Sequence, residues 1–517
     1  MAARAAEPGL RAVVRLGGET FSYDAQGAED LGAFSSPAGF TQRCLRAAAG
    51  RLPLTVHFRP DQGSDRLEVV FELGRVWDAS AKNLGPYRVE IRRGDQTIAS
   101  VDVPQHFWFG RWRWQSAPRP LAAGIATLRE RGLIPPYARG REKFFARAPD
   151  SGPAERYRIM ELAGVFPQMG ATGERHDIGL VTEHQARYLC TEDPSALATL
   201  RAQAEAAGTL PWHIRDERTD GPVDLDRHAT MSWYGDPNVA KPHIPFAKTG
   251  ISIDSAHQPA LAYIPYLLTG DPYHLEDLQF AANYNRGELP PAYRLSIPQP
   301  RSFAWSMRTL AQAAKVTPER VPRWLLPASY FRADLERTRT WFEKEYVNSP
   351  DPLRRIFRAT DNLAYSRDES PQAPEGTWIS PWQHEFLAAS LGWIVLMGFE
   401  EWREAFLWQI GGTLARTAGR SGWHRAYPSP YRLLIKNEKS EGAVESWSEA
   451  WRISRTRAKW EERDDLAYED PTYAIYTRGA LAIAARAGVT EAAAPLTWIT
   501  EQLHRKDAAV PYKWRLI

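Results

Sequence analysis

Cysteine is scarce in this 517-residue sequence, which contains only Cys44 and Cys190. The two are far apart and form no CxxC pair or other metal-binding or redox spacing, so they allow at most one disulfide. An HExxH zinc motif, a tight carboxylate cluster, a GxGxxG or Walker phosphate loop and a GxSxG nucleophile motif are also missing. We therefore expect no metal and no cofactor, and nucleotide or α/β-hydrolase chemistry lacks support.

Excess charge and long apolar runs are missing as well. Lys and Arg number 65 against 62 Asp and Glu, and no basic run stands out, so we expect no nucleic-acid partner. No stretch approaches the roughly 20 apolar residues that span a bilayer, so we expect a soluble chain with no membrane partner. Residues 1–9 lack the apolar segment of a signal peptide, which indicates a cytoplasmic or virion-associated location unless the natural chain is longer. Nothing in the sequence fixes the oligomeric state.

Aromatic residues, by contrast, are plentiful, with 20 Trp and 20 Tyr. Aromatic rings stack on sugar faces, and the polar tips of Trp and Tyr suit wet clefts. Large helical proteins also place such residues in their cores, so composition alone moves the interpretation only slightly toward a carbohydrate ligand.

The first 120 residues have strand composition, in short and partly alternating segments separated by Gly, Asp or Pro. Their spacing predicts a β domain over residues 1–120, either an antiparallel sandwich or a small barrel. Residues 106–114, a run of aromatic residues and arginines, are expected to form a seam between domains, with a ligand-binding surface as the alternative. Residues 121–155, rich in Pro, Gly and Arg, are predicted to connect to a helical domain at 156–517. The strand segments lie at 10–16, 54–58, 67–73, 87–92 and 98–103.

The helical part contains an internal repeat. Residues 187–194 align with 265–272, and each stretch is followed by a helix of similar length. The order of an apolar helix, a short turn and an amphipathic helix returns more loosely at 386–417 and 473–504. Repeated helical hairpins bury a core by stacking side by side, which predicts a mainly α domain closed into an α/α toroid, with an open solenoid as the alternative. In a toroid the apolar helices form a parallel inner ring, so their N-terminal ends gather at one mouth.

The stretch 254–272 shows this pattern most clearly. Asp254 or the following serine is expected to cap the first helix, and Pro259 to stand in its first turn. The residues after Pro259 are apolar and predict a buried helix that ends at Gly270, after which Asp271 caps a second helix. The first helix begins with Asp, His and Gln, groups that are costly to bury without partners. That start is either a hydrogen-bonded helix end or the wall of a polar cleft.

The second helix of this stretch is predicted to be amphipathic. Leu275, Leu278 and Ala282 form one apolar stripe, whereas Glu276 and Asp277 lie elsewhere on its circumference. We expect such helices to form the outer ring of a toroid.

Polar residues before the inner helices and in the long loop from 212 to 249 are expected to share one cleft. Helix N-termini carry positive potential and favour carboxylates, so this cleft suits an acidic sugar. The predicted catalytic residues are His257, Tyr263, Arg301 and His384. The predicted substrate-binding residues are Trp212, His213, Arg215, Asp254, Gln258, Trp305, Trp382 and Gln383.

The first reaction that fits such a cleft is β-elimination at a uronic acid. Arg301 would neutralise the carboxylate and stabilise the developing enolate. His257 would take the C5 proton, because imidazole titrates near neutral pH. Tyr263 would protonate the leaving oxygen, with His384 as the alternate acid, and the roles of His257 and Tyr263 could be reversed. The tyrosine could also be Tyr266 or Tyr365.

Two alternatives stay open. Glycoside hydrolysis needs two carboxyl groups about 5–10 Å apart, for which Asp254 and Glu385 are candidates. The other is a non-catalytic protein, either a glycan-binding component or a phage virion structural protein. An aromatic surface without a convergent set of His, Tyr and Arg would favour binding alone.

Several segments carry a resemblance to known proteins: DIG at 177–179, ARYL at 186–189, WHIRD at 212–216, DSAHQPALAY at 254–263, AWSMRTL at 304–310 and PWQ at 381–383. They resemble a group of largely uncharacterised bacterial proteins. That group is similar to exo-rhamnogalacturonan lyase-like proteins, which combine an N-terminal β domain, a RIFT barrel, with an α/α toroid. The resemblance covers roughly residues 105–400 and implies a polysaccharide lyase whose partner is a uronate-containing polysaccharide or oligosaccharide. Two features depart from it, because His184 stands where an aromatic residue is expected and no secretion signal is visible.

Overall fold

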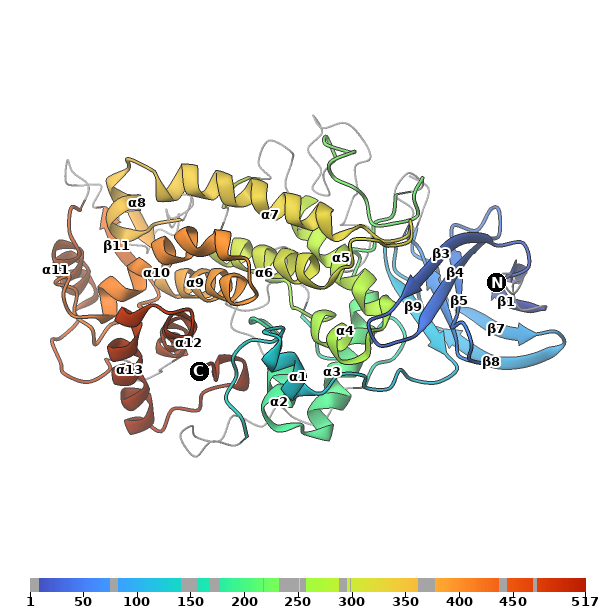
Figure 1. The fold of residues 1–517 in the computed structure, drawn as a ribbon, viewed down its shortest axis with the longest axis horizontal. Helices are drawn as coiled ribbons and strands as arrows, with labels where there is room; N and C mark the ends of the chain where they lie inside the picture. Colours follow the sequence, from blue (N-terminus) through green and yellow to red (C-terminus); the bar gives the residue numbers. More distant parts are fainter. Residues whose placement is uncertain are drawn as a thin grey trace.

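The computed structural model describes residues 9–74, 82–140, 156–166, 177–216, 218–231, 251, 257–287, 295–297, 299–360, 377–436, 444–467 and 472–517. The molecule is elongated, with the N-terminal strands at one end and helices along the rest of its length (Figure 1). The C-terminal residues return to the middle of the molecule, where Leu516 pairs with Tyr137. The chain therefore consists of an N-terminal antiparallel β region followed by a helical region.

The β region contains two antiparallel sheets. The four-stranded sheet has the order β2 (Glu19–Asp24), β1 (Leu10–Leu16), β7 (Tyr87–Arg93) and β8 (Gln96–Val103). The five-stranded sheet has the order β3 (Glu29–Ser35), β4 (Thr41–Ala48), β5 (Thr55–Pro60), β6 (Leu67–Glu72) and β9 (Arg111–Gln115). The predicted strand segments correspond to β1, β5, β6, β7 and β8. The pattern missed β2, β3 and β4, which carry Ser, Asp, Gly and Arg between their apolar residues, and β9 lies inside the aromatic run.

Side-chain alternation explains how the two sheets share one core. Val89 and Ile91 of β7 point into the same apolar cluster as Val56 of β5, in the other sheet. β6 differs, because every residue in it is buried. One face of β6 meets the shared core, whereas Glu68 and Glu72 on the other face form ion pairs with arginines. The five-stranded sheet is therefore covered on both faces at β6.

Consecutive helices pack as pairs; the internal repeat predicts four of these pairs, but it does not predict the pair formed by Pro300–Val316 and Ala328–Phe342. The pairs differ in the length of the connection between their two helices. Three further helices lie outside the pairs: α1 (Ile125–Glu130), α8 (Pro352–Phe357) and α11 (Trp447–Ala458). The pairs are α2 (Glu183–Thr191) with α3 (Pro194–Ala206), α4 (Tyr263–Thr269) with α5 (Pro272–Gly287), α6 (Pro300–Val316) with α7 (Ala328–Phe342), α9 (Pro381–Leu396) with α10 (Arg403–Thr417), and α12 (Thr472–Arg486) with α13 (Ala493–Arg505).

The start of α4 differs from the prediction, but its end agrees. α4 begins at Tyr263 with Ala262 as an N-cap that makes no side-chain hydrogen bond, so Pro259 does not stand in its first turn. The reason is that backbone carbonyls of the preceding segment accept hydrogen bonds from side chains of α2 and α6, which holds that segment out of the helix. Gly270 ends α4 with a φ of 65°, and the Asp271 carboxylate accepts the backbone N–H of Tyr273 at 3.2 Å.

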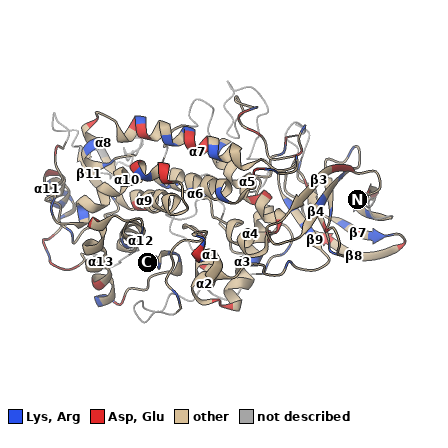
Figure 2. Cartoon of the chain, viewed as in Figure 1, with Lys and Arg blue, Asp and Glu red and all other residues tan. Residues whose placement is uncertain are grey.

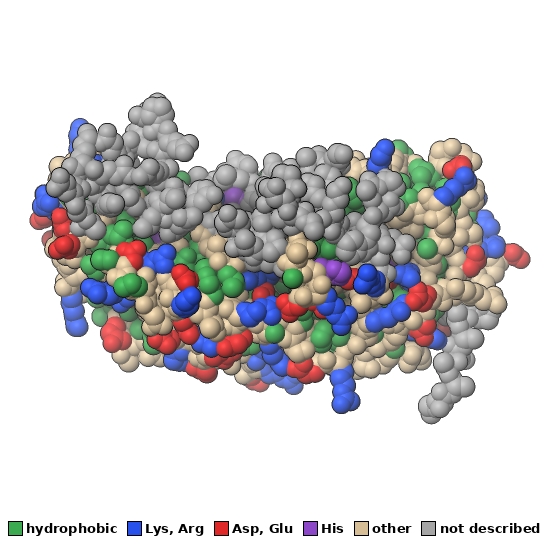
Figure 3. Space-filling view, turned by 90° about the horizontal axis from the view of Figure 1, so that it is seen from above, with side chains coloured by type: hydrophobic (Ala, Val, Ile, Leu, Met, Phe, Trp, Pro, Cys, Tyr) green, Lys and Arg blue, Asp and Glu red, His purple; other side chains and the backbone are tan. Residues whose placement is uncertain are grey.

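The largest apolar core lies among the first helices of the pairs. α6 packs along α9 and α9 along α12, and residues from α2, α4, α6, α9 and α12 share one cluster. α9 is apolar almost throughout, whereas α7 carries acidic and basic residues along its outer face (Figure 2). Charges of both signs alternate over the described part of the surface seen from above (Figure 3). The apolar helices are therefore central and the charged ones peripheral.

Candidate functional site

The N-terminal ends of three helices meet in one place. Arg301, in the first turn of α6, donates its backbone N–H to the side-chain oxygen of Gln383, in the first turn of α9, at 3.4 Å. Trp382, beside Gln383, packs against Tyr473 in the first turn of α12, with ring centroids 5.7 Å apart. Because these helices also pack along their lengths, α6, α9 and α12 run parallel and start at the same end.

Aromatic side chains gather at these helix starts. Trp382 stacks on Tyr431 with ring centroids 6.0 Å apart, and Tyr431 lies 5.8 Å from Tyr473. The guanidinium carbon of Arg301 lies 5.6 Å from the centre of the Trp382 ring. Tyr431 is 43% exposed, whereas Trp382 beneath it is only 2% exposed. We call Arg301, Trp382, Gln383, Tyr431 and Tyr473 the helix-start cluster.

The helix-start cluster combines groups that suit an acidic saccharide. An exposed tyrosine ring can stack on a sugar face, and a guanidinium can bind a carboxylate through two parallel hydrogen bonds. Three helix N-termini at the same place add positive potential. Arg301 is oriented by Gln299, whose side-chain oxygen accepts from its Nε at 2.9 Å. The sequence pattern missed Tyr431, since it stands just before the short strand β11 (Leu433–Lys436) and not at the start of a helix.

Further along α6, Trp305 and Arg308 follow Arg301 by about one and two turns. The Arg308 guanidinium lies 4.9 Å from the Trp305 ring and donates to the backbone carbonyl of Gln258 at 2.7 Å. Burial lowers the pKa of Arg308 to about 9. His257, next to Gln258 in the chain, is buried as well. The structure therefore places His257 and Gln258 beside α6, roughly two turns from the helix-start cluster.

Two of the predicted catalytic residues, His384 and Tyr263, form hydrogen bonds with backbone groups of the protein. His384 Nδ1 binds the backbone carbonyl of Ser380 at 3.0 Å, and its Nε2 accepts the backbone N–H of Thr360 at 3.3 Å. Burial lowers the pKa of His384 to about 4, so the ring is neutral at pH 7. The Tyr263 hydroxyl is enclosed and donates to the carbonyl of Leu133 at 2.5 Å, and burial raises its pKa. Their polar atoms bind the protein's own backbone.

The carboxyl pair considered for hydrolysis has one described member. Glu385 is fully buried on α9, where it accepts from Ser429 at 2.8 Å and forms an ion pair with Arg416. Burial raises the pKa of this carboxyl group. Asp254, the other member and also a predicted substrate-binding residue, lies outside the described residues. Glu385 therefore has a local structural role, as a link between α9, α10 and the segment that follows α10.

Three predicted substrate-binding residues lie at the junction of the β region with α5. His213 Nε2 binds the carboxylate of Asp277 on α5 at 2.6 Å. Arg215 forms an ion pair with Glu276, also on α5, at 2.5 Å. Trp212 is buried in the core of the β region. The structure thus places these residues in the junction, whereas Arg301, Trp382 and Gln383 belong to the helix-start cluster.

A buried network of charges holds this junction. Arg113 of β9 binds Asp271, just before α5, at 2.7 Å, which agrees with the prediction that residues 106–114 form a seam. Burial alone would raise the pKa of Glu276, but the neighbouring arginines hold this pKa well below its usual range. We call this network the buried ionic seam. Its members are Arg59, Glu68, Glu72, Arg111, Arg113, Arg215, Asp271, Glu276 and Asp277.

Within the described part of the chain, no three His, Cys, Asp or Glu residues are grouped in a way that could hold a metal ion. None of the helices in these described residues is long and apolar enough to cross a membrane.

Neither the family models nor the curated protein sequences contain a match to this chain.

Proposed function

We propose that the protein binds an acidic saccharide at the helix-start cluster and cleaves it by β-elimination. The observation that carries this proposal is the packing of two tyrosines on Trp382, where the guanidinium of Arg301 also lies: Tyr431 stacks on the ring and Tyr473 packs against it at a tilt. The aromatic rings supply a surface for the sugar, and the cation supplies a partner for its carboxylate.

The architecture proposed with this function is an α/α toroid that follows a β sandwich. α2, α4, α6, α9 and α12 would form the inner ring. The contacts of α6 with α9 and of α9 with α12 support it, and α12 and α2 both contact the C-terminal turn Tyr512–Trp514. The ring would close where Gln185 of α2 donates to the carbonyl of Ala260, just before α4, at 2.8 Å. Two sheets with a shared core support the sandwich.

In the proposed reaction, Arg301 binds the uronate carboxylate and stabilises the negative charge that develops on it. A base takes the C5 proton, a double bond forms between C4 and C5, and the C4–O bond breaks. His257, the base predicted from the sequence, lies about two turns along α6 from Arg301, so it fills this role only if the saccharide-bound form brings its ring to the cluster. Tyr431 or Tyr473 gives a proton to the leaving oxygen, in place of Tyr263 and His384, whose polar atoms bind backbone groups.

Two measurements test this proposal on a panel of acidic polysaccharides. The first is the ultraviolet absorbance of the unsaturated uronate product, which should rise with time and be lost in His257→Ala. The second is saccharide affinity, which Tyr431→Ala should lower by about 3- to 10-fold, because an aromatic stacking contact contributes roughly 0.5–1.5 kcal/mol. Phe166→Ala is the matched control, since Phe166 is 49% exposed and lies outside the cluster. New reducing ends without the absorbance would replace elimination with hydrolysis.

A second candidate function is saccharide binding without cleavage. The observation that favours it is the engagement of both predicted acids, Tyr263 and His384, by backbone groups. In that case Tyr431→Ala would weaken binding, and no polysaccharide of the panel would give an unsaturated product or new reducing ends.

A further inference from the structure

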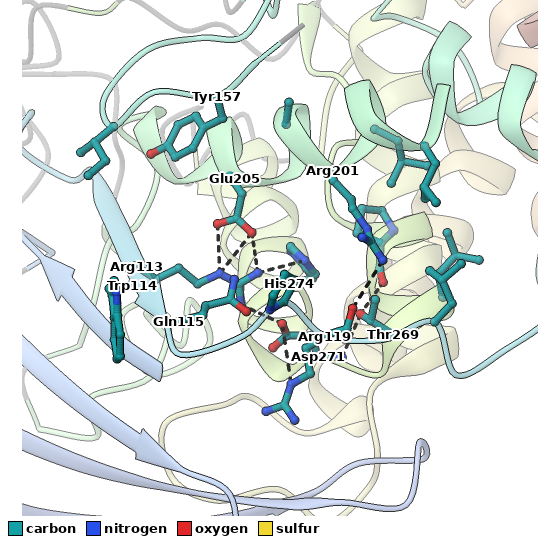
Figure 4. Close-up of a pocket in the computed structure, with 18 of the residues that line it drawn as sticks. Arg113, Trp114, Gln115, Arg119, Tyr157, Arg201, Glu205, Thr269, Asp271 and His274 are labelled. Atoms are coloured by element: carbon teal, nitrogen blue, oxygen red, sulfur yellow. Dashed lines mark hydrogen bonds and ion pairs between the residues drawn. The ribbon is translucent and has the colours of Figure 1, made fainter. Parts of the chain in front are cut away.

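A second place in the molecule has the form of a ligand site. A cleft of about 550 Å³ lies where the chain leaves β9, between α3 and the turn that joins α4 to α5 (Figure 4). This volume falls within the range of roughly 300–1,000 Å³ that is typical of small-molecule sites. None of the residues of the helix-start cluster lines this cleft. The cleft is therefore separate from the proposed saccharide site.

One part of the cleft wall is aliphatic. Leu121 follows β9, Leu197 and Leu200 come from α3, and Pro265 and Leu268 come from α4. These aliphatic side chains favour burial of an alkyl or aryl group, and Trp114 and Tyr157, which also line the cleft, add aromatic surface that suits an aryl group (Figure 4). The apolar part of the wall therefore favours a ligand with an apolar body.

The charged part of the cleft contains arginines in two different situations. Arg113 is compensated by Glu205 at 2.5 Å and by Asp271 at 2.7 Å, and Arg119 is compensated by Asp61 at 2.5 Å. Arg201, one helical turn before Glu205 on α3, reaches into the cleft and forms no ion pair with any residue that the structure describes (Figure 4). It donates only a long hydrogen bond, 3.4 Å, to the carbonyl of Arg119. Arg201 is therefore available to an anion.

His274 also lines the cleft, but both of its ring nitrogens are enclosed within the protein. Its Nε2 lies 3.3 Å from Arg113 Nη2, and because a guanidinium can only donate, Nε2 accepts this hydrogen bond. Burial lowers the pKa of His274, so the ring is neutral and its proton sits on Nδ1. His274 is 6% exposed, and its Nδ1 has no hydrogen-bond partner in the described part of the chain. Because Nδ1 has almost no exposed surface, Arg201 and not His274 is the polar group that a ligand in the cleft would reach.

We propose that this cleft binds a small organic acid, with its carboxylate on Arg201 and its alkyl or aryl body against the leucines of α3 and α4. The inference goes beyond the saccharide site and does not rest on it. Because the cleft is lined by residues from β9, α3 and α5, an occupant would contact the junction of the β region with the helices. Binding would therefore also stabilise the folded chain.

Isothermal titration calorimetry on the full chain tests the proposal with matched probes. Octanoate is expected to bind saturably at one site, and benzoate represents the aryl form of the same chemistry. Acetate has the charge without the body, and octanol has the body without the charge, so both should bind at least about tenfold more weakly than octanoate. Octanol that binds as tightly as octanoate, glucuronate that binds more tightly, or no saturable binding of octanoate or benzoate would overturn the proposal.

Two exposed positions keep the test independent of folding. Arg201→Gln is expected to weaken octanoate binding about tenfold or more, because it removes a charged hydrogen bond and leaves a neutral side chain of similar reach. Leu121→Asn, at a residue that is 41% exposed, should weaken binding by a smaller factor. Arg505→Gln, at the distant end of α13, is the control and should bind like the unaltered protein. Unchanged affinity in Arg201→Gln would overturn the assignment.

Discussion

The buried ionic seam and the helix-start cluster both contain arginines, but these arginines have different neighbours. In the seam, Arg111 and Arg215 face Glu276 in a space closed to water. In the cluster, Arg301 is 6% exposed and lies against the amide of Gln299 and the ring of Trp382, on which the exposed Tyr431 also stacks. Paired charges in a closed space hold two parts of a fold together, whereas the proposed saccharide would reach Arg301 from the side of the exposed Tyr431 ring. The comparison predicts that substitutions in the seam change stability and that substitutions in the cluster change binding.

The largest expected effect is on the seam. Glu276→Ala should lower the free energy of unfolding by about 3–5 kcal/mol, because it leaves buried arginines without their carboxylate. Chemical denaturation followed by tryptophan fluorescence measures this loss. Glu336→Ala is the control, since Glu336 pairs with Arg339 on the exposed face of α7 and should contribute less than about 1 kcal/mol. Similar losses in the two variants would contradict the structural role given to the seam.

A second prediction concerns pH and the buried histidine of α9. Burial lowers the folded-state pKa of His384 from 6.5 to about 4, so the unfolded chain binds its proton first as the pH falls. The contribution of His384 to stability is therefore complete above pH 6.5 and is lost as the pH falls toward 4, with a slope that approaches about 1.4 kcal/mol per pH unit. His384→Gln should flatten the stability profile by that slope in this window. An unchanged profile would show that His384 is protonated equally in both states.

His106, in the β region, gives an internal comparison for that experiment. Its pKa is also lowered to about 4 by burial, and its ring binds Tyr87 and the carbonyl of Gly110. In His384→Gln this second histidine still titrates, so the variant should keep a reduced acid sensitivity. If the stability of His384→Gln no longer depended on pH in this window, His384 alone would account for the acid sensitivity of the protein.

The smallest expected effect is on the tyrosine of α4. Tyr263→Phe removes one hydrogen bond to the Leu133 carbonyl and should cost about 1 kcal/mol of stability, measured by denaturation. Because the hydroxyl is buried against backbone, saccharide binding and any cleavage activity should be retained. Loss of cleavage with unchanged binding would show that Tyr263 is the proton donor. The catalytic residues would then not be confined to the helix-start cluster.

For helix α5, the local sequence pattern predicts where the helix starts and which residues form its apolar stripe, but not how much of the helix is buried. Its start at Asp271 and Pro272 and its apolar stripe follow from residue type and spacing, and both are present in the structure. The same pattern predicts an outer helix with a polar face, but every residue of α5 is buried. The reason is that the β region covers that face and supplies Arg59 and Arg111 to Glu276. A charge pattern read along one helix does not reveal a sheet that comes from more than 150 residues earlier.

The helix-start cluster likewise contains residues that the sequence pattern predicts and one that it does not. Arg301, Trp382 and Gln383 are recognisable because each stands in the first turn of an apolar helix, and parallel helices bring such turns together. Tyr431 carries no such signal, because its place depends on how the segment after α10 folds back onto Trp382.

The sequence by itself determined five of the nine strands in the two sheets, four of the five helical pairs and the turn between α4 and α5, because these follow from interactions between residues close together in the chain. The tertiary structure decided which polar residues are buried and which are exposed. His213 and Arg215 have the same chemistry as His257 and Arg301, but their partners on α5 are about 60 residues away, and only the packing of the β region against α5 brings them together. The free energy of a buried charge depends on such distant partners, and residue type alone does not specify them.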